Sequence, residues 1–356
     1  VTIGVLVSMF SALVVTRVLL EILTRFSAID SRPRLMGMHV GQRFQRWLHE
    51  SVPNLFSDWK KWLIISAVAV VLAFGGIFGR GIQLGLEFEG GRLVEYSTAQ
   101  PVDINVLRSE LAEVGLARAL IQESGQGTVV IRTEQLDPAE EQALVDTVTE
   151  VDGEATLVRD QFVGPTLGAE LRNRALMALG LALLVQLAYL AIRFRWTIGL
   201  AAVASMFHDV AILIGVFAWL GKTFDGVFLA SLLTVIGYSV NDSVVIFDRI
   251  RERLGLEPDR PLADISNEAC LQTVPRTINT GLGAILILIS LYVLGGDTLG
   301  DFALALLIGI VVGTYSSVFT ATPAFLALEQ RFPRPPPEPV KPSQRRARER
   351  SRSTRR

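Results

Sequence analysis

The chain has 356 residues, of which 50% are hydrophobic and 19% are charged, and its formal net charge is −1. A soluble domain carries about a quarter charged residues, whereas runs of about 20 apolar residues mark membrane helices. Composition therefore excludes a soluble protein and indicates an integral membrane protein. The single cysteine, Cys270, excludes an internal disulfide and a cysteine-rich metal site, and we expect no metal or cofactor.

Residues 1–23 form an apolar run that predicts a first membrane helix, and the run does not fit a short cleaved signal peptide. It aligns without gaps with the last predicted helix, in the pairs Gly4 and Gly309, Val7 and Val312, and Ser11 and Ser316. This is weak evidence for an internal repeat, because small residues recur in packed membrane helices. If the repeat is real, this first helix closes a preceding half.

Residues 24–61 form a linker rich in Arg and Lys, which the positive-inside rule places in the cytoplasm. The next predicted helix, residues 62–79, therefore runs outward, and we expect the soluble segment 84–165 on the outer side. From residue 85 to residue 170 there are 17 acidic residues against five arginines and no lysine, a local net charge of −12. Ordinary solubility is favoured over a basic-ligand surface as the reason for this charge.

The segment 84–165 begins with GLEFEGG and ends with VGPTLG, and its pattern alternates between strands and helices. We expect strands at 93–98, 119–123, 128–133 and 155–159, and helices at 103–114 and 138–151. The order β-α-β-β-α-β is the ferredoxin-like split motif. The predicted fold class is therefore a membrane α-helical bundle with one inserted α+β ferredoxin-like outer domain.

Residues 174–328 predict a bundle of five further membrane helices, at about 174–192, 196–220, 234–253, 274–294 and 302–328. A loop at residues 249–269 is expected on the cytoplasmic side. Residues 329–356 form a basic tail that we expect to be disordered and cytoplasmic. An unstructured topology signal is favoured for this tail over contact with anionic lipid or ribosomal RNA.

Three of the predicted helices carry polar residues that are costly in hydrocarbon, where a carboxylate costs about 2.5–3.5 kcal/mol on insertion scales. These residues are His208 and Asp209, then Tyr238, Asn241 and Asp242, and finally Arg276, Asn279 and Thr280. Helical spacing places Tyr238 and Asp242 on one face. Since the last two helices are antiparallel, Asp242 and Arg276 could meet at similar depth.

A buried acid beside an arginine can take up and release a proton, because the cation favours the ionised form and desolvation favours the neutral form. Several alternatives remain open. Asp242 could simply be hydrogen-bonded to a neighbouring helix, and Arg276 could lie in the headgroup region. His208 is more often a packing histidine than a proton relay, and Asp209 could pair with the neighbours of His208 or with a missing half.

These residues lie in motifs that resemble the SecF subunits of the bacterial SecDF protein-export complex over about residues 60–330. The motifs are IGYSVNDSVVIFDRIRE (236–252), FHDV (207–210), PRTINT (275–280), GLEFEGG and VGPTLG. Residues 1–25 resemble the final helix of SecD, so the chain resembles a SecD–SecF fusion that lacks most of SecD.

The resemblance implies a resistance–nodulation–division type membrane half that uses the proton-motive force to help pull polypeptides from the Sec channel. It implies no enzymatic activity, a multi-pass location in the bacterial plasma membrane, and SecD, SecY, SecE, SecG and emerging unfolded preprotein as partners. It assigns the essential membrane acid to Asp242 and the essential arginine to Arg276. Glu87 stands where the family usually has Asp, and Pro275 and Gly281 stand where Ser is common.

Two rival functions follow from the same residues. A proton-coupled small-molecule efflux transporter of the same superfamily would need a larger outer domain than residues 84–165 provide. An intramembrane aspartyl protease would need Asp209 and Asp242 close together to share a proton, and the nearby arginine argues against it. The sequence leaves open whether the coupling ion is H⁺ or Na⁺.

Overall fold

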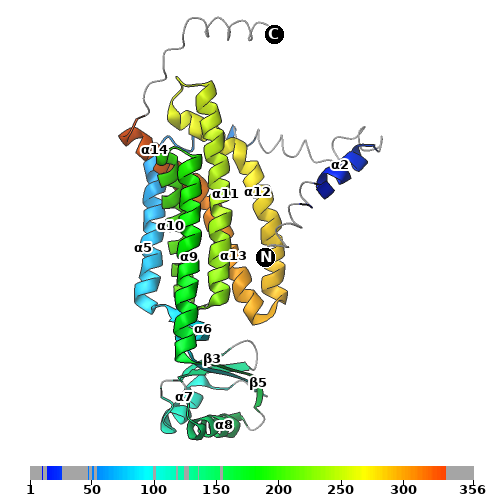
Figure 1. Ribbon diagram of the computed structural model, residues 1–356, viewed down its shortest axis with the longest axis vertical. Coiled ribbons are helices and arrows are strands. Elements are labelled where there is room, and N and C mark those ends of the chain that lie inside the picture. The colour runs from blue at the N-terminus through cyan, green and yellow to red at the C-terminus, as the bar shows by residue number, and fades with distance from the viewer. Residues whose placement is uncertain are drawn as a thin grey trace, which may run out of the picture.

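A computed structural model of the chain describes residues 10, 14–25, 47, 50–51, 54–98, 102–117, 119–123, 128–134, 136–152 and 155–333. It consists of a long helical bundle with a small α+β domain at one end (Figure 1). The short helix α2 (Thr16–Arg25) belongs to the predicted first helix and its linker. Most of these two segments, and the tail beyond residue 333, lie outside the described residues.

Six helices in the described part of the chain are long and apolar enough to cross a membrane, which confirms the predicted membrane helical bundle. They are α5 (Trp59–Arg80), α9 (Pro165–Arg193), α10 (Trp196–Leu220), α11 (Gly226–Leu256), α12 (Leu262–Leu294) and α13 (Gly296–Ser316), the last continuing through the π-helical turn η3 (Ser317–Ala321) into α14 (Thr322–Arg331).

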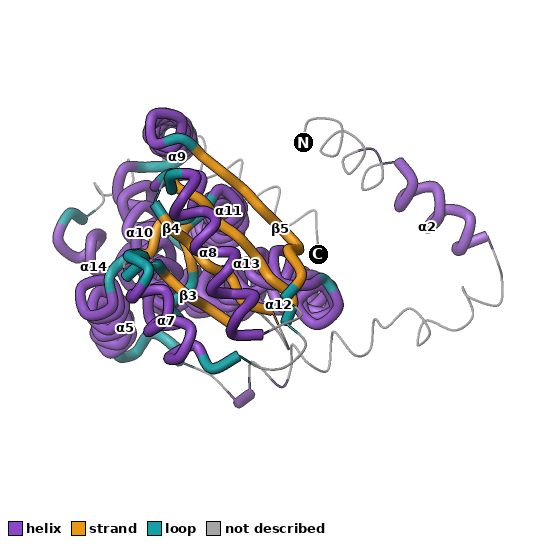
Figure 2. Tube along the Cα trace, turned by 90° about the horizontal axis from the view of Figure 1, so that it is seen from below, coloured by secondary structure: helices purple, strands orange, loops and turns teal. Residues whose placement is uncertain are grey.

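Three of these helices form the core of the bundle. In a view down the bundle axis, α10, α11 and α13 lie near the centre, whereas α5, α9 and α12 lie at the periphery (Figure 2). The apolar stretch of α10 is 56% buried and that of α11 is 50% buried, against 6% for α9 and 17% for α5 and α12. The central and peripheral helices therefore differ in how much of their surface is left for lipid or a partner.

Two core helices approach each other closely. Gly309 of α13 packs on Val235 of α11, because a Cβ at Gly309 would overlap a Val235 methyl carbon. One turn further along, a Cβ at Gly313 would lie 3.1 Å from the Cβ of Ser239. Small residues at such positions let two membrane helices pack backbone to backbone.

The predicted loop at residues 249–269 is wrong, because only residues 257–261 separate α11 from α12. Charged residues pair along and between the helices and do not end them. Arg253 pairs with Glu257 at 3.3 Å and with Glu268 of α12 at 2.6 Å. The i, i+4 pair with Glu257 supports the helix, and the pair with Glu268 ties the two helices together.

Three other helices begin at least six residues earlier than predicted, among them the helix expected from 234, which begins at Gly226. The helix expected from 174 begins at Pro165, a residue that suits the first helical turn. Its 29 residues span about 43 Å at 1.5 Å per residue, more than the roughly 30 Å hydrocarbon core of a bilayer. α9 thus runs without a break from the α+β domain into the bundle. The helix expected from 302 begins at Gly296.

The α+β domain has the predicted order of elements, namely β2 (Gly91–Ser97), α7 (Ile104–Glu113), β3 (Leu120–Glu123), β4 (Thr128–Thr133), α8 (Pro138–Asp152) and β5 (Thr156–Val163). Its strands form one antiparallel sheet in the order β3-β4-β2-β5. α7 and α8 cover the face turned away from the bundle (Figure 1). Leu107, Leu111 and Ile131 are fully buried in the core of this domain.

Two short elements at the junction of domain and bundle were not predicted. β1 (Gln83–Leu84) pairs in parallel with β6 (Thr223–Phe224), which lies between α10 and α11. Helix α6 (Leu86–Glu89) lies within the GLEFEGG segment and immediately precedes the sheet. The junction is therefore a folded unit and not a simple linker.

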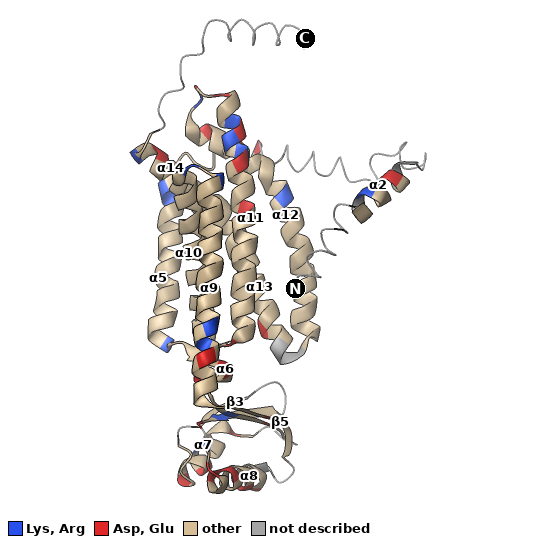
Figure 3. Ribbon diagram, in the orientation of Figure 1, with Lys and Arg blue, Asp and Glu red and all other residues tan. Residues whose placement is uncertain are grey.

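Charged residues are concentrated towards the two ends of the molecule (Figure 3). Acidic residues are prominent in the α+β domain, and basic residues gather at the end of the bundle opposite that domain. The middle of the bundle carries few charges, as a membrane-spanning structure requires.

The sheet of the α+β domain is stabilised by an ion pair between its two neighbouring strands β2 and β5. Arg92 Nε donates to Asp160 Oδ1 at 2.9 Å and Nη2 donates to Oδ2 at 2.7 Å, and Arg92 also pairs with Glu141 of α8. This hydrogen bonding from Arg92 lowers the pKa of Asp160 below its ordinary value. The ionised Asp160 carboxylate therefore stabilises the domain above the unfolded-state pKa of about 3.9. This stabilisation is lost as the pH falls through the lower folded-state pKa.

Asp160→Asn should therefore destabilise the α+β domain at neutral pH, by about 1 kcal/mol after discounting for solvent screening. The discount is needed because the Asp160 side chain is 37% exposed. Hydrogen exchange of the β2 and β5 amides in the full chain, compared at equal pH, should be faster in the variant at pH 7. The difference should shrink below about pH 4, and a difference that is unchanged there would argue against the ion pair.

Candidate functional site

A buried polar cluster lies where α10, α11 and α13 meet. Asp209 of α10 is only 1% exposed. Its Oδ2 accepts hydrogen bonds from the hydroxyls of Ser239 on α11 and Ser316 on α13, the latter at 2.7 Å. Its Oδ1 lies 2.9 Å from His208 Nδ1. One carboxyl group thus links all three core helices, and both of its buried oxygens lie within hydrogen-bonding distance of a polar partner, as burial of a polar group requires.

The cluster extends in two directions. Ser205, one turn before Asp209, donates to Ser316 at 3.1 Å. On the other side, the ring of His208 stacks on Tyr315 with centroids 6.1 Å apart, and the Tyr315 hydroxyl lies 3.4 Å from Ser66 of α5. His208 Nε2 is buried and has no hydrogen-bond partner in the part of the chain that the structure describes. A row of polar groups therefore crosses the bundle from α11 to α5.

The π-helical turn η3 follows Ser316 directly. It contributes Thr320, whose hydroxyl lies 2.7 Å from the Ser66 hydroxyl. Single π-helical turns within α-helices are frequently found at functional sites, because they redirect side chains. Here the turn falls where α13 supplies the cluster with its hydroxyl groups.

Asp242 lies on α11, three residues after Ser239, and is 5% exposed. Its Oδ2 is buried and has no hydrogen-bond partner within the described residues. Tyr238, one turn before it, places its hydroxyl against Gly281 of α12, where a Cβ would lie 3.3 Å away. Asp242 is thus a buried carboxyl group with an unsatisfied oxygen, next to the α11–α12 contact.

Arg276 of α12 lies near enough to Asp242 for their charges to interact. Among the described residues, however, no ion pair with a nitrogen–oxygen distance of 4.0 Å or less joins the two. Arg276 is exposed and lines a groove of about 500 Å³ between α11 and α12, together with Asp248, Arg249 and Glu252. The groove gives Arg276 a polar route to the end of the bundle opposite the α+β domain.

The remaining polar residues of the predicted constellation lie on the outside of the bundle. Asn241, Asn279 and Thr280 are all exposed. The Thr280 hydroxyl donates to the backbone oxygen of Arg276, at 2.9 Å. The structure therefore divides the predicted set into a buried cluster around Asp209, an acid at the α11–α12 contact, and an exposed polar face on α12.

The bundle spans the membrane, contains buried carboxyl groups and is interrupted between two of its helices by an α+β domain. These features define a multi-pass membrane protein with titratable groups inside its spans. The family model for protein export membrane protein SecD/SecF, C-terminal, matches residues 143–331, and the SecD/SecF GG motif matches residues 75–102. The chain therefore belongs to the SecD/SecF family, and the relatives that it matches over most of their length are SecF subunits.

One such relative is the protein translocase subunit SecF of Pseudomonas aeruginosa, 37% identical over 72% of the chain and 85% of the relative. The protein translocase subunit SecDF of Thermus thermophilus is 35% identical over 92% of the chain and 44% of the relative. A crystal structure of SecDF from Thermus thermophilus, a translocon-associated membrane protein, matches with a TM-score of 0.72 and 35% identity over 77% of this chain and 38% of that chain. The chain thus spans less than half the length of these SecDF proteins.

Proposed function

We propose that the chain is the SecF part of a Sec protein-export accessory complex and that it couples the proton-motive force to the export of polypeptides. The observation that carries this proposal is Asp242, a buried carboxyl group in a membrane-spanning helix, with an unpartnered oxygen and Arg276 within electrostatic reach. A carboxyl group in such a place is costly, and ionisable groups inside membrane helices often lie on an ion or proton pathway.

The coupling would act through the contact between α11 and α12. An ionised Asp242 attracts the Arg276 guanidinium and a protonated one does not, so each proton taken up or released changes the attraction between the two helices. The groove beside Arg276 is lined by charged side chains, among them Asp248, Arg249 and Glu252, and would admit water from one side of the bundle. One charge moved through 100 mV is worth about 2.3 kcal/mol, so a few protons could drive a movement of the α+β domain.

Asp209 and His208 form the second titratable group of the proposed site. Asp209 accepts a hydrogen bond from Ser239 of α11, the helix that also carries Asp242. A change in its protonation would alter the hydrogen bonds that tie α10 and α13 to α11. Tyr238, Asn241, Asn279 and Thr280 complete the proposed set as neighbours on α11 and α12.

The fold supports a finer assignment. We assign the α+β domain to the ferredoxin-like class, which the sheet order β3-β4-β2-β5 with two helices on one face supports, and we assign the bundle to a resistance–nodulation–division type half. The basic end of the bundle would face the cytoplasm and the acidic α+β domain the outer side of a bacterial plasma membrane. We assign residues 1–23 to the last helix of a SecD part, since the SecDF relative matches 92% of the chain.

The exposed polar face of α12 supports a partner within the membrane. Arg276, Asn279 and Thr280 would be costly against acyl chains, and polar groups at such positions usually face another helix or a water cavity. A SecD part is the proposed cover for this face. The Sec channel (SecY, SecE and SecG) and the emerging preprotein are the further partners of the proposed complex.

The proposal is tested by export into vesicles that contain the chain, a SecD part and the Sec channel. An imposed proton gradient should increase the export of a model preprotein, and a protonophore should remove the increase. A sodium gradient in a parallel experiment identifies the ion. Equal export with and without either gradient, or gradient-driven efflux of a small dye from the same vesicles, would contradict the proposal.

A further inference from the structure

The short helix α6 stands between the membrane bundle and the α+β domain. Only Gly90 separates its last residue from β2, the strand that pairs with both β4 and β5. Gly90 and Gly91 have φ angles of +81° and +116°, a backbone conformation that favours glycine. The first turn of α9 packs directly on this corner, because a Cβ at Gly168 would lie 2.9 Å from the backbone nitrogen of Gly90. A displacement of α6 must therefore displace the sheet.

The same helix is bound to the start of α11. Gly85 donates its N–H to the backbone oxygen of Phe224 at 2.9 Å and so continues the β1–β6 pairing. The Glu87 carboxylate then accepts the backbone N–H of Gly226 at 3.0 Å. A Cβ at Gly226 would lie 2.5 Å from this carboxylate oxygen, so a larger residue there would displace the carboxylate. A carboxylate at a helix start also interacts favourably with the helix dipole.

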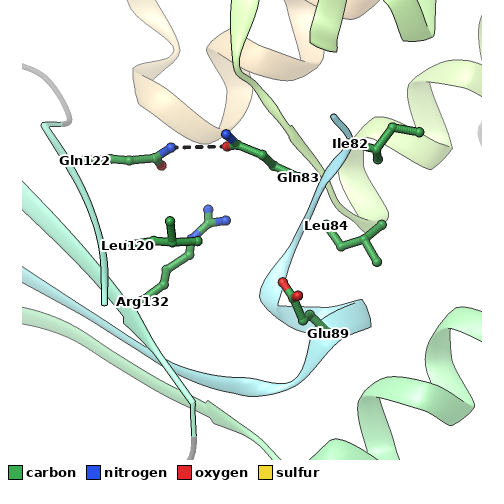
Figure 4. A pocket seen from close by; sticks show the side chains of 7 residues that line it. All are labelled: Ile82, Gln83, Leu84, Glu89, Leu120, Gln122 and Arg132. Carbon is green, nitrogen blue, oxygen red and sulfur yellow. Dashed lines mark hydrogen bonds between the residues drawn. The ribbon is translucent and has the colours of Figure 1, made fainter. Parts of the chain in front are cut away.

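Among the described residues, other connections between the sheet and the bundle are sparse. Three hollows of about 200, 490 and 780 Å³ lie beneath the sheet, and Arg132 of β4 lines all three. In the first of them Arg132 and Glu89 lie on opposite sides, and the hydrogen bond drawn across it joins Gln122 to Gln83 at 3.5 Å (Figure 4). The domain is therefore attached to the bundle chiefly through α6 and the entry to α9.

The helix that Glu87 holds is the one that carries Asp242. Asp242 lies sixteen residues after Gly226, about 24 Å along α11 at 1.5 Å per residue. The core of α11 is packed closely against α13 at Gly309 and Gly313. A tilt or shift of α11 at the depth of Asp242 would therefore reach the start of the helix, and there the Glu87 carboxylate is its side-chain link to the α+β domain.

We infer that Glu87 is a positioning residue that makes the α+β domain follow the movements of α11. The inference rests on the proposed function, since it explains how a change in the protonation of Asp242 would move the α+β domain. The GLEFEGG segment then connects the movement of α11 to the α+β domain. Its glycines allow α9, α6 and β2 to pack closely, and Glu87 binds the start of α11.

The contact itself is tested by hydrogen exchange on the full chain in its membrane complex. Glu87→Ala should make the backbone amides of residues 223–229 exchange about fivefold faster, because Gly226 loses a charged acceptor. Glu89→Ala is the matched control, since Glu89 lies in the same short helix and faces the hollow beside Arg132. Unchanged exchange in the Glu87 variant, or an equal rise in both variants, would overturn the inference.

Transmission is tested by fluorescence energy transfer between labels on the domain and the bundle. Glu150→Cys on α8 and Leu294→Cys at the end of α12 are exposed positions, and the native Cys270 is fully buried. Asp242→Asn should shift the transfer efficiency in the otherwise native chain but not in a chain that also carries Glu87→Ala. The same shift in both backgrounds would overturn the inference. If neither background shifts, the proposed function fails, while hydrogen exchange still decides the role of Glu87.

Discussion

Asp242→Asn should reduce proton-driven export to the level seen without a gradient. The amide keeps the shape of the carboxyl group but cannot take up or release a proton. Since one charge in a 100 mV potential is worth about 2.3 kcal/mol, roughly forty-fold in an equilibrium, each lost charge removes a large bias. Export of a model preprotein into gradient-bearing vesicles measures the loss.

The structure gives this variant a good prospect of folding. Asp242 Oδ2 accepts no hydrogen bond from the described residues, so no protein donor at that oxygen is left without its acceptor. Thr234→Ala is a suitable control on the same helix, because Thr234 is exposed and its hydroxyl donates to the backbone oxygen of Ala230, one turn earlier. Gradient-dependent export of an Asp242→Asn protein at the level of this control would contradict the proposed mechanism.

Charged residues within apolar runs could be recognised from the sequence alone. Asp209 and Asp242 stand out because a carboxylate is rare in a membrane helix. Which way they face could not be predicted to the same degree. Asn241 and Asp242 are neighbours, yet the helix turns about 100° between them, so one is exposed and the other buried. Only the packing of α11 on its neighbours decides between the two.

The hydroxyl partners of Asp209 could not be found in this way. Ser239 and Ser316 come from helices far apart in the sequence, and serine is common in membrane helices for reasons of size alone. The π-helical turn after Ser316 leaves no periodic signal that a single sequence reveals. Ser205 gave a faint local signal, since it lies one turn before Asp209 on the same helix.

The elements of the α+β domain were predictable because its strands and helices have clear periodicity and turn residues. The junction was not. β1 and β6 have two residues each, which is too short for any periodic pattern. The GLEFEGG motif was recognisable as a motif, but its contact with Gly226 joins segments 139 residues apart. Such contacts follow from the way that α10 and α11 return the chain to the domain.

The second large effect is expected at Asp209, whose carboxylate holds three core helices together. Asp209→Ala should destabilise the folded chain by about 3–5 kcal/mol, because Ser239, Ser316 and His208 lose their common buried acceptor. Asp209→Asn should cost much less, since an amide oxygen can still accept from both serines. Denaturant titration of the purified chain in detergent, followed by tryptophan fluorescence, measures both variants.

Export by the Asp209→Asn protein then separates a structural role from a coupling role. If Asp209 changes its protonation during transport, this variant should fold and yet lose most of its gradient-driven export. Ser205→Ala is the matched control within the cluster, because Ser205 donates to Ser316 and, among the described residues, makes no hydrogen bond to the Asp209 carboxylate. Normal export by Asp209→Asn, combined with strong destabilisation by Asp209→Ala, would show that the cluster only holds the three helices together. Proton coupling would then rest on Asp242 and Arg276.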